Sequence, residues 1–204
     1  MSEPLRVRVH YDFASSLCYV AHRALARLAA PLDALGIELV WTPLELARLV
    51  GPHRPGAAID ELRRANAARV AAELGVTLRV PRIWPDVATL GAVALLADER
   101  GRGASFRERA WSAVFEEGLV AADAADALRL ARDLSLALEP EALAPALQEL
   151  ERRTETAREE QVSGVPTFMF GSWPFGGIQT DETMLRVFER FAAKARATGS
   201  PGEA

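Results

Sequence analysis

The first part of the chain changes from one spacing of apolar residues to another. Residues 5–12 place an apolar side chain at every second position, the pattern of a strand with one buried face. Residues 15–36 carry apolar side chains at helical spacing, and Pro31 and Gly36 are expected to end that helix. Residues 37–43 then have the composition of a second strand. A strand, a helix and a strand in this order favour a right-handed crossover between parallel strands, and therefore an α/β fold.

The middle of the chain, residues 44–163, has almost wholly helical spacing, interrupted by glycine and proline. Helices are expected at residues 59–74, 86–98, 105–117, 122–133 and 140–161. Strand character returns at residues 165–170 and 173–177, and an amphipathic helix over residues 180–198 follows. The strands from the two ends of the chain must therefore meet in one sheet, with a helical insertion between them.

This organisation predicts one domain from residues 1–45 and 162–198, interrupted by an all-helical insertion at residues 46–161. Residues 199–204 are expected to form a flexible tail. A chain of 204 residues with 50% hydrophobic composition can bury roughly 70% of the surface that its unfolded form exposes. One compact domain with an embedded subdomain is consistent with that length.

Charge and hydropathy exclude two classes of partner. The net charge is -4 and no basic stripe is present, so nucleic acid is not an expected partner. No apolar run approaches the roughly 20 residues that span a bilayer, and the first residues lack the pattern of a signal peptide. The sequence therefore predicts no membrane association and a cytoplasmic location.

A single cysteine, Cys18, excludes an internal disulfide and a metal cage built of cysteines alone. The histidines, His10, His22 and His53, have no spacing that gathers a metal with a carboxylate on one helix face. No metal site is predicted.

The first candidate for chemistry is the point where the first strand passes into the first helix. Ser15 and Ser16 lie there, among the free N–H groups and the positive dipole end that stabilise an anion such as a thiolate. The simpler interpretation is that one of these serines only caps the helix. Cys18 and His22 share a helix face, so a protonated imidazole could favour a thiolate; the alternative is that Cys18 is a buried structural residue.

The second candidate is the proline at the start of the strand over residues 165–170. It either begins that strand in the ordinary way or follows a cis peptide bond between Val165 and Pro166. In the cis form, the N–H and C=O of Val165 would turn outward and could pair with an extended peptide such as glutathione.

Both candidate segments resemble those of one family. Residues 12–19, DFASSLCY, resemble the Asp-aromatic-x-Cys-Pro-x-Cys-Tyr segment of DsbA-like oxidoreductases of the FrnE group. They equally resemble the Ser-Pro-x-Ser-Tyr segment of 2-hydroxychromene-2-carboxylate isomerases and kappa-class glutathione transferases. Residues 164–168, GVPTF, are similar to the cis-proline loop of these proteins, and residues 84–85, 110–118 and 176–179 also have counterparts. The resemblance implies a thioredoxin-like fold with an inserted all-helical subdomain.

The departures from the oxidoreductases determine the expected function. Ser15 stands where these enzymes carry the attacking cysteine, and Cys18 stands at the place of the resolving one. A hydroxyl cannot replace the first thiolate at neutral pH, so dithiol exchange is not expected. In the isomerases and kappa-class transferases, serine at this place donates a hydrogen bond to the thiolate of bound glutathione. The resemblance therefore implies a transferase- or isomerase-like enzyme in which Ser15, within an S-x-x-C motif that ends at Cys18, activates glutathione or another low-molecular-weight thiol.

The resemblance also implies further contacts. Ser16, Val165 and Pro166 are expected to hold the thiol, while Thr180 and Asp181 either cap the last helix or hold a carboxylate at its start. The expected second substrate is a small apolar compound, and a homodimer is expected. The Asn that follows a proline in the isomerase insertion has no counterpart after Pro85, so their aromatic substrate is not implied. A redox protein acting through Cys18 alone and a non-catalytic peptide-binding protein are the alternatives.

Overall fold

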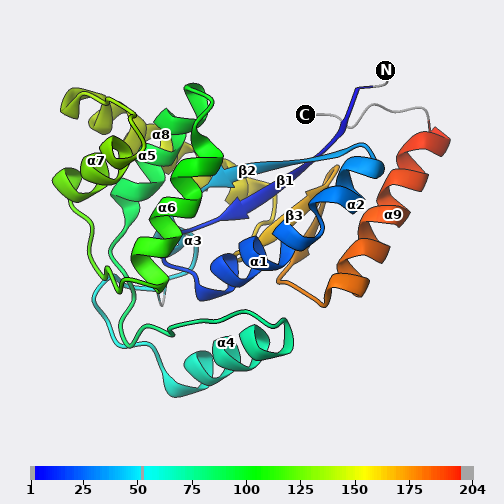
Figure 1. The fold of residues 1–204 in the computed structure, drawn as a ribbon, viewed down its shortest axis with the longest axis horizontal. Helices are drawn as coiled ribbons and strands as arrows, with labels where there is room; N and C mark the ends of the chain where they lie inside the picture. The colour runs from blue at the N-terminus through cyan, green and yellow to red at the C-terminus, as the bar shows by residue number, and fades with distance from the viewer. Residues whose placement is uncertain (1–2, 52, 199–204) are drawn as a thin grey trace.

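Strands from the two ends of the chain form one mixed sheet, in the order β2-β1-β3-β4 (Figure 1). The structure is a computed structural model that describes residues 3–51 and 53–198. β1 pairs in parallel with β2 and antiparallel with β3, and β3 pairs antiparallel with β4. The strands are β1 (Leu5–Tyr11), β2 (Ile37–Pro43), β3 (Thr167–Phe170) and β4 (Trp173–Gly176). The predicted α/β fold and the predicted meeting of the terminal strands are both confirmed.

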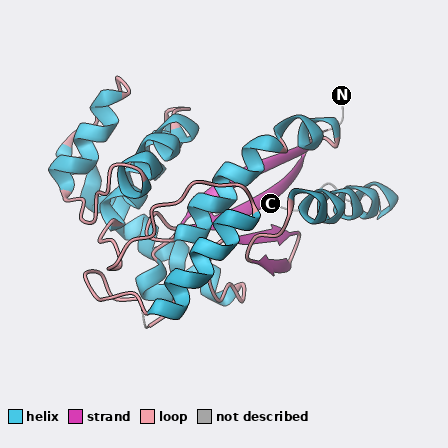
Figure 2. Cartoon of the chain, turned by 60° about the horizontal axis from the view of Figure 1, so that its bottom comes forward, coloured by secondary structure: helices cyan, strands magenta, loops and turns pink. Residues whose placement is uncertain are grey.

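Helices are the most frequent elements of the described chain. They are α1 (Ser16–Arg27), α2 (Ala29–Ala34), α3 (Leu46–Leu49), α4 (Glu61–Glu73), α5 (Ala88–Glu99), α6 (Gly103–Phe115), α7 (Ala124–Asp133), α8 (Leu143–Glu159) and α9 (Asp181–Thr198), with a 3-10 turn, η1, at Pro140–Ala142. Figure 2 shows helices on both sides of the strands, with most of them gathered on one side. None of the helices in the described part of the chain is long and apolar enough to cross a membrane.

Three local expectations need correction. The single helix predicted over residues 15–36 is two helices, because Pro31 has no N–H for the bond that a continuous helix would need at that position. The helix predicted over residues 140–161 begins with a 3-10 turn. The short helix α3 was not predicted, since four residues are too few to show a period. The tail predicted at residues 199–204 lies outside the described residues.

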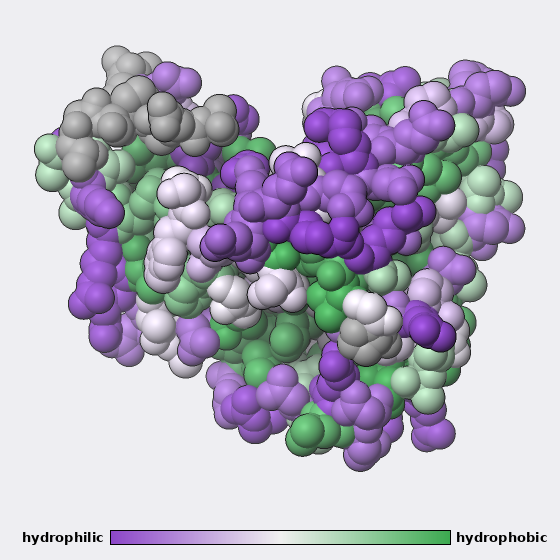
Figure 3. Space-filling view, turned by 180° about the vertical axis from the view of Figure 1, so that it is seen from behind, coloured by the Kyte–Doolittle hydropathy of each residue, from purple (hydrophilic) through white to green (hydrophobic). Residues whose placement is uncertain are grey.

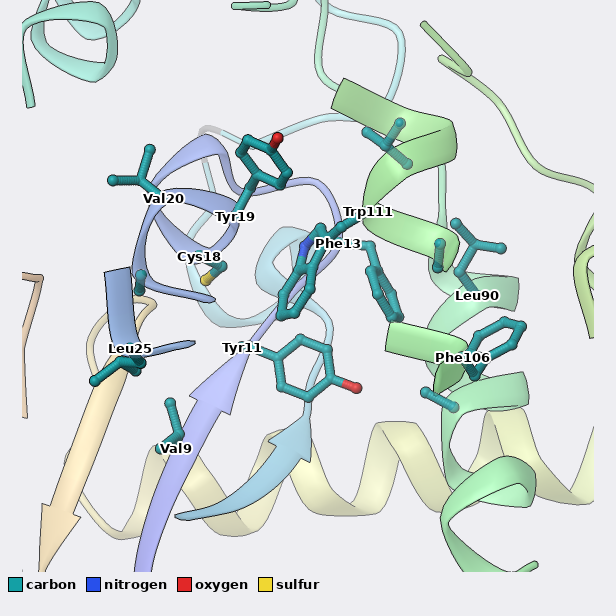
Figure 4. Packing of buried hydrophobic residues seen from close by; sticks show 14 of the residues in the cluster. Val9, Tyr11, Phe13, Cys18, Tyr19, Val20, Leu25, Leu90, Phe106 and Trp111 are labelled. Atoms are coloured by element: carbon teal, nitrogen blue, oxygen red, sulfur yellow. The ribbon is translucent and has the colours of Figure 1, made fainter. Parts of the chain in front are cut away.

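One hydrophobic core runs from the sheet into the insertion (Figure 4). Tyr11 and Phe13, at the end of β1, each lie with their ring centroid 5.2 Å from that of Trp111 in α6. Phe13 also makes an edge-on contact with Phe106, at 6.3 Å between centroids. Because large rings from both parts interlock, α5 and α6 are held firmly against the sheet.

The helix α4 is attached differently from the rest of the insertion. It lies apart from α5–α8 and packs against α1 (Figure 1). Of its residues, Ala67 and Ala71 are buried. Long segments without helix or strand precede and follow it, with one isolated bridge between Ala58 and Ile83. α4 therefore covers the start of α1 with little buried apolar surface of its own.

Candidate functional site

A cleft of about 380 Å³ lies where the start of α1 faces α4 and the loop before β3. Ser15, Ser16 and Val165 line it together, although Val165 is far from the two serines in sequence. Its apolar wall consists of Leu17, Leu46, Val50, Ile59, Val80 and Trp84. Figure 3 shows the molecule from behind. A band of polar residues crosses the middle, α4 lies at the bottom, and apolar residues are exposed between the two. The cleft thus joins a helix N-terminus to an apolar surface.

Ser15 is the N-cap of α1. It is 6% exposed, and its Oγ accepts a hydrogen bond from the N–H of Cys18 at 3.3 Å. The capping interpretation is therefore confirmed. Capping uses the hydroxyl as an acceptor, so its own hydrogen, which is close to the sulfur of Cys18, can be donated either to that sulfur or to a ligand. The same side chain can cap the helix and serve a ligand in the cleft.

Cys18 lies behind Ser15 rather than in the cleft. Its side chain is fully buried, and burial raises the pKa of the thiol to about 12, although hydrogen bonds with Ser15 and the backbone of Asp12 oppose the rise. His22, on the same helix face, bonds Glu108 through Nε2 at 2.7 Å, and burial lowers the pKa of its imidazole. This arrangement fits a structural thiol.

The loop before β3 presents Val165 to the cleft. The Val165–Pro166 peptide bond is cis, as the resemblance implies. Pro166 is buried behind Val165, and its carbonyl accepts from the N–H of Gly177 at 2.8 Å. The hydroxyl of Thr167 donates to the carbonyl of Gly164 at 2.7 Å, which ties the loop to itself. Among the described residues, neither the N–H nor the C=O of Val165 has a hydrogen-bond partner.

Thr180 and Asp181 lie at another place. Thr180 caps the start of α9, where its Oγ1 accepts from the N–H of Thr183 at 3.3 Å. Asp181 is bound by Arg27 through two hydrogen bonds of 2.8 Å. Both line an open depression of about 600 Å³ beside Arg27, whereas Ser15 is at the opposite end of the 12-residue helix α1. At a rise of about 1.5 Å per residue, the two ends are roughly 16 Å apart. The structure does not bring this pair into the cleft with Ser15.

The cleft also contains a cationic wall that sequence reasoning missed. Arg63 and Arg64 reach it from α4, and none of the described residues that line it is Asp or Glu. Arg63 pairs through Nε with Asp60 at 2.9 Å, and Arg64 pairs with Glu61 at 2.7 Å. The Nε of Arg64 is enclosed without a hydrogen-bond partner in the described structure. The adjacent arginines were visible in the sequence, but the face that they present depends on the docking of α4.

A buried carboxyl group, that of Asp12, lines a smaller pocket next to the cleft. Asp12 is 9% exposed and accepts hydrogen bonds from the backbone N–H of Ala14 at 2.7 Å and of Leu46 at 2.5 Å. Burial raises the pKa of this carboxyl to about 6, although both hydrogen bonds oppose the rise. Asp12 thereby ties the turn between β1 and α1 to the start of α3. In the described part of the chain, no group of three or more His, Cys, Asp or Glu side chains could hold a metal ion.

Comparisons with known proteins identify a family and a fold for the chain. The family described as DSBA-like thioredoxin domain matches residues 6–189. Among solved structures, a 2-hydroxychromene-2-carboxylate isomerase aligns with a TM-score of 0.68 and 19% identity over 96% of this chain and 98% of its own. A probable DsbA oxidoreductase from Streptomyces coelicolor also reaches 0.68, with 23% identity over 93% and 91% of the two chains.

A third structure is the cytosolic disulfide reductase DsbM from Pseudomonas aeruginosa. It aligns with a TM-score of 0.63 and 19% identity over 95% of this chain and 98% of its own. A structure of DsbM with GSH aligns with a TM-score of 0.61. A search of curated proteins finds no match to the sequence. At these identities, the structural likeness concerns the fold.

Proposed function

Since the chain belongs to the DSBA-like thioredoxin domain family, which includes oxidoreductases and isomerases, we propose that it binds glutathione or a related small thiol and activates it. The observation that carries this proposal is the joint placement of Ser15 and Val165 in one cleft, with the cysteine buried behind them. The reacting sulfur then belongs to the ligand. Thiol-dependent transfer or isomerisation of a small apolar compound is the reaction that we propose.

Ser15 has the chemistry to lower the pKa of a bound thiol. Its hydroxyl can donate to the thiolate at the start of α1, where the N–H groups of the first turn also stabilise negative charge. A charge-assisted hydrogen bond of this kind contributes roughly 1.5–3 kcal/mol. At about 1.36 kcal/mol per unit, that corresponds to a thiol pKa lowered by about one to two units.

The rest of the cleft supports a peptide-like, anionic thiol. The free N–H and C=O of Val165 can pair with an extended backbone, as in strand addition. Arg63 and Arg64 add positive charge to a lining that contains no carboxylate among the described residues. Glutathione has both a peptide backbone and carboxylates, so it matches these groups better than a small neutral thiol does. The structure of DsbM with GSH supports the choice of glutathione as the first thiol to test.

A redox reaction through Cys18 alone fits the geometry less well. Its thiol is fully buried, and a pKa of about 12 leaves almost no thiolate at neutral pH to begin a mixed disulfide. The apolar wall of the cleft, which includes Trp84 and Leu46, instead offers room for an electrophile beside the thiol. A passive peptide groove would bind the same ligands without ionising them.

Ultraviolet difference titration of glutathione separates these functions, because a thiolate absorbs where a thiol does not. We expect Ser15→Ala to keep much of its affinity for glutathione, while the pKa of the bound thiol rises by about one to two units. Cys18→Ala is expected to leave the thiolate signal almost unchanged. Thiol activation by Ser15 is wrong if the wild type forms no thiolate, or if Cys18→Ala removes the signal and Ser15→Ala does not.

A further inference from the structure

His53 is a titratable group that the proposed function leaves unused. It belongs to the segment between α3 and α4, and its ring makes an edge-on contact with Trp84, at 4.3 Å between centroids. It lines the cleft that contains Ser15, and it also lines a smaller cavity beside Asp12. The imidazole therefore lies where the thiol cleft meets a second, smaller pocket.

Two hydrogen bonds determine which nitrogen of His53 carries the proton. The Nη1 of Arg63 lies 2.9 Å from Nε2, and a guanidinium can only donate, so Nε2 must accept. The proton is then on Nδ1, which donates to the carbonyl of Val50 at 3.1 Å. A backbone carbonyl on Nδ1 fixes both the tautomer and the orientation of the ring. The basic nitrogen of a neutral imidazole thus points toward Arg63 in the cleft.

Arg63 is the charge in direct contact with His53. Burial lowers the pKa of the imidazole, the bond to Val50 opposes this, and Arg63 lowers the pKa further. The other charged residues that share a cavity with His53 are Arg64, Asp12, Glu45 and Asp86. Asp12 is bonded to backbone N–H groups, Glu45 to Arg48, and Arg64 to Glu61. A ligand that engages Arg63 would therefore change the charge closest to the ring.

We propose that His53 accepts the proton of the thiol bound at Ser15, and that Arg63 occupies its Nε2 until an anionic ligand enters; this inference rests on the function proposed above. A ligand carboxylate pairs with Arg63 and frees Nε2. The S–H bond then breaks, its proton forms an N–H bond to Nε2, and the electron pair remains on sulfur. The products are a thiolate next to Ser15 and an imidazolium whose two N–H groups face the ligand and Val50.

This coupling would make thiol activation depend on the anionic part of the ligand. A neutral thiol leaves the hydrogen bond from Arg63 to Nε2 of His53 in place, so the imidazole has no free lone pair to take the proton. An anionic thiol adds a second negative charge beside Arg63, whose Nε already pairs with Asp60, and this raises the basicity of His53 at the moment when a base is needed. The imidazolium can later return the proton to the product, as isomerisation and addition reactions require.

Proton counting tests the role of His53. The thiolate formed on glutathione binding near neutral pH is measured by ultraviolet absorbance. The protons released are measured by calorimetry in buffers with different ionisation enthalpies. In the wild type, we expect the number of protons released to be smaller than the number of thiolates formed, because His53 retains the thiol protons. In His53→Gln, the two quantities should be equal. Arg69→Gln in α4 is the control: Arg69 pairs with Glu73 and bonds Asn66 but does not itself line the cleft, so this variant should behave as the wild type does.

A second measurement uses a ligand that has no thiol proton to give. S-methylglutathione keeps the carboxylates of glutathione but has no thiol to ionise. In the wild type, it should raise the pKa of the His53 imidazole, followed by nuclear magnetic resonance, and in Arg63→Gln this rise should be lost. If glutathione forms a thiolate but the wild type releases one proton for each, or if S-methylglutathione binds without moving the His53 titration, the role of His53 is refuted and the proposed function survives. If the wild type forms no thiolate, both fail.

Discussion

Ser15 and Cys18 are three positions apart but have opposite environments. Ser15 borders the cleft and keeps a hydrogen to donate, while Cys18 lies beneath the first turn of α1 with no exposed surface. The helix N-terminus stabilises an anion only where the group faces the free N–H groups and can be reached by a ligand. For Cys18, the loss of solvation outweighs the favourable hydrogen bonds, so its pKa rises instead of falling.

Alkylation measures this environment of Cys18. With a thiol pKa of about 12, native Cys18 is expected to react with iodoacetamide on the order of 10³-fold more slowly than in urea, because its thiolate population is smaller by about that factor at mildly alkaline pH. Its burial should slow the reaction further. Mass spectrometry of timed samples gives both rates. Rapid labelling of the native protein would instead support the reactive interpretation.

His10 should make folding sensitive to acid. It is 2% exposed, its ring nitrogens have no hydrogen-bond partner in the described structure, and burial lowers its pKa to about 4. Because the pKa is lower in the folded state, the stability due to neutral His10 is complete above about pH 6.5 and declines as the pH falls toward about 4. Asp12, whose pKa is raised to about 6, acts in the opposite direction.

The variant His10→Leu isolates the contribution of His10. Between about pH 7 and about pH 4.5, we expect it to lose roughly 2–3 kcal/mol less unfolding free energy than the wild type, from the pKa difference between the folded and unfolded imidazole. Urea unfolding at both values measures the difference. Equal losses in the two proteins would show that His10 is not held neutral by burial.

At the level of the elements, the contact between α5 and α8 depends on Gly91. A Cβ at this position would lie 2.9 Å from Cδ2 of Leu150 and 3.3 Å from its Cδ1. Leu150 is 1% exposed, so its side chain has little room to move. Alanine would improve helix propensity by about 1 kcal/mol, but overpacking of a filled core costs about 1–3 kcal/mol. The close approach of the two helices therefore requires glycine.

We expect Gly91→Ala to destabilise the protein by about 1 kcal/mol net, since overpacking exceeds the gain in propensity. In a Leu150→Ala background, the obstacle is absent, and the same substitution should stabilise the protein by up to about 1 kcal/mol. Chemical unfolding of the four proteins gives this coupling. A destabilisation of the same size in both backgrounds would place the strain somewhere other than at Leu150.

At the scale of the whole molecule, α4 is the element with the least support. It buries Ala67 and Ala71, whereas α5 buries most of its residues in the common core. We expect the amides of α4 to exchange with deuterium about 10²-fold or more faster than those of α5, because local opening of α4 exposes little apolar surface.

Since α4 forms the cationic wall of the cleft, glutathione should slow the exchange of amides in α4 and leave that of α5 unchanged. Equal protection of the two helices in the free protein would contradict this.

The sequence alone was sufficient for the fold. The alternation of apolar residues predicts β1 closely, because a strand with a buried face repeats at two residues whatever surrounds it. The composition of residues 37–43 predicts β2 with the bounds that it has in the structure. The motifs at residues 12–19 and 164–168 identified the family that the comparison with known families confirms. They also led to Ser15, since a helix start is visible in the local sequence.

The tertiary structure alone decided which residues share the cleft with Ser15. Arg63 and His53 face it because of how α4 and the segment before it dock, and neither carries a periodic signal. Asp181 accepts a hydrogen bond from Arg27 at the other end of α1, although the local sequence suggested the same capping role for Asp181 as for Thr180. The burial of Cys18 also depends on what packs over the helix. Local spacing determines an element and its caps, whereas solvation, pKa and the partners across a cleft arise from contacts between residues that are distant in sequence.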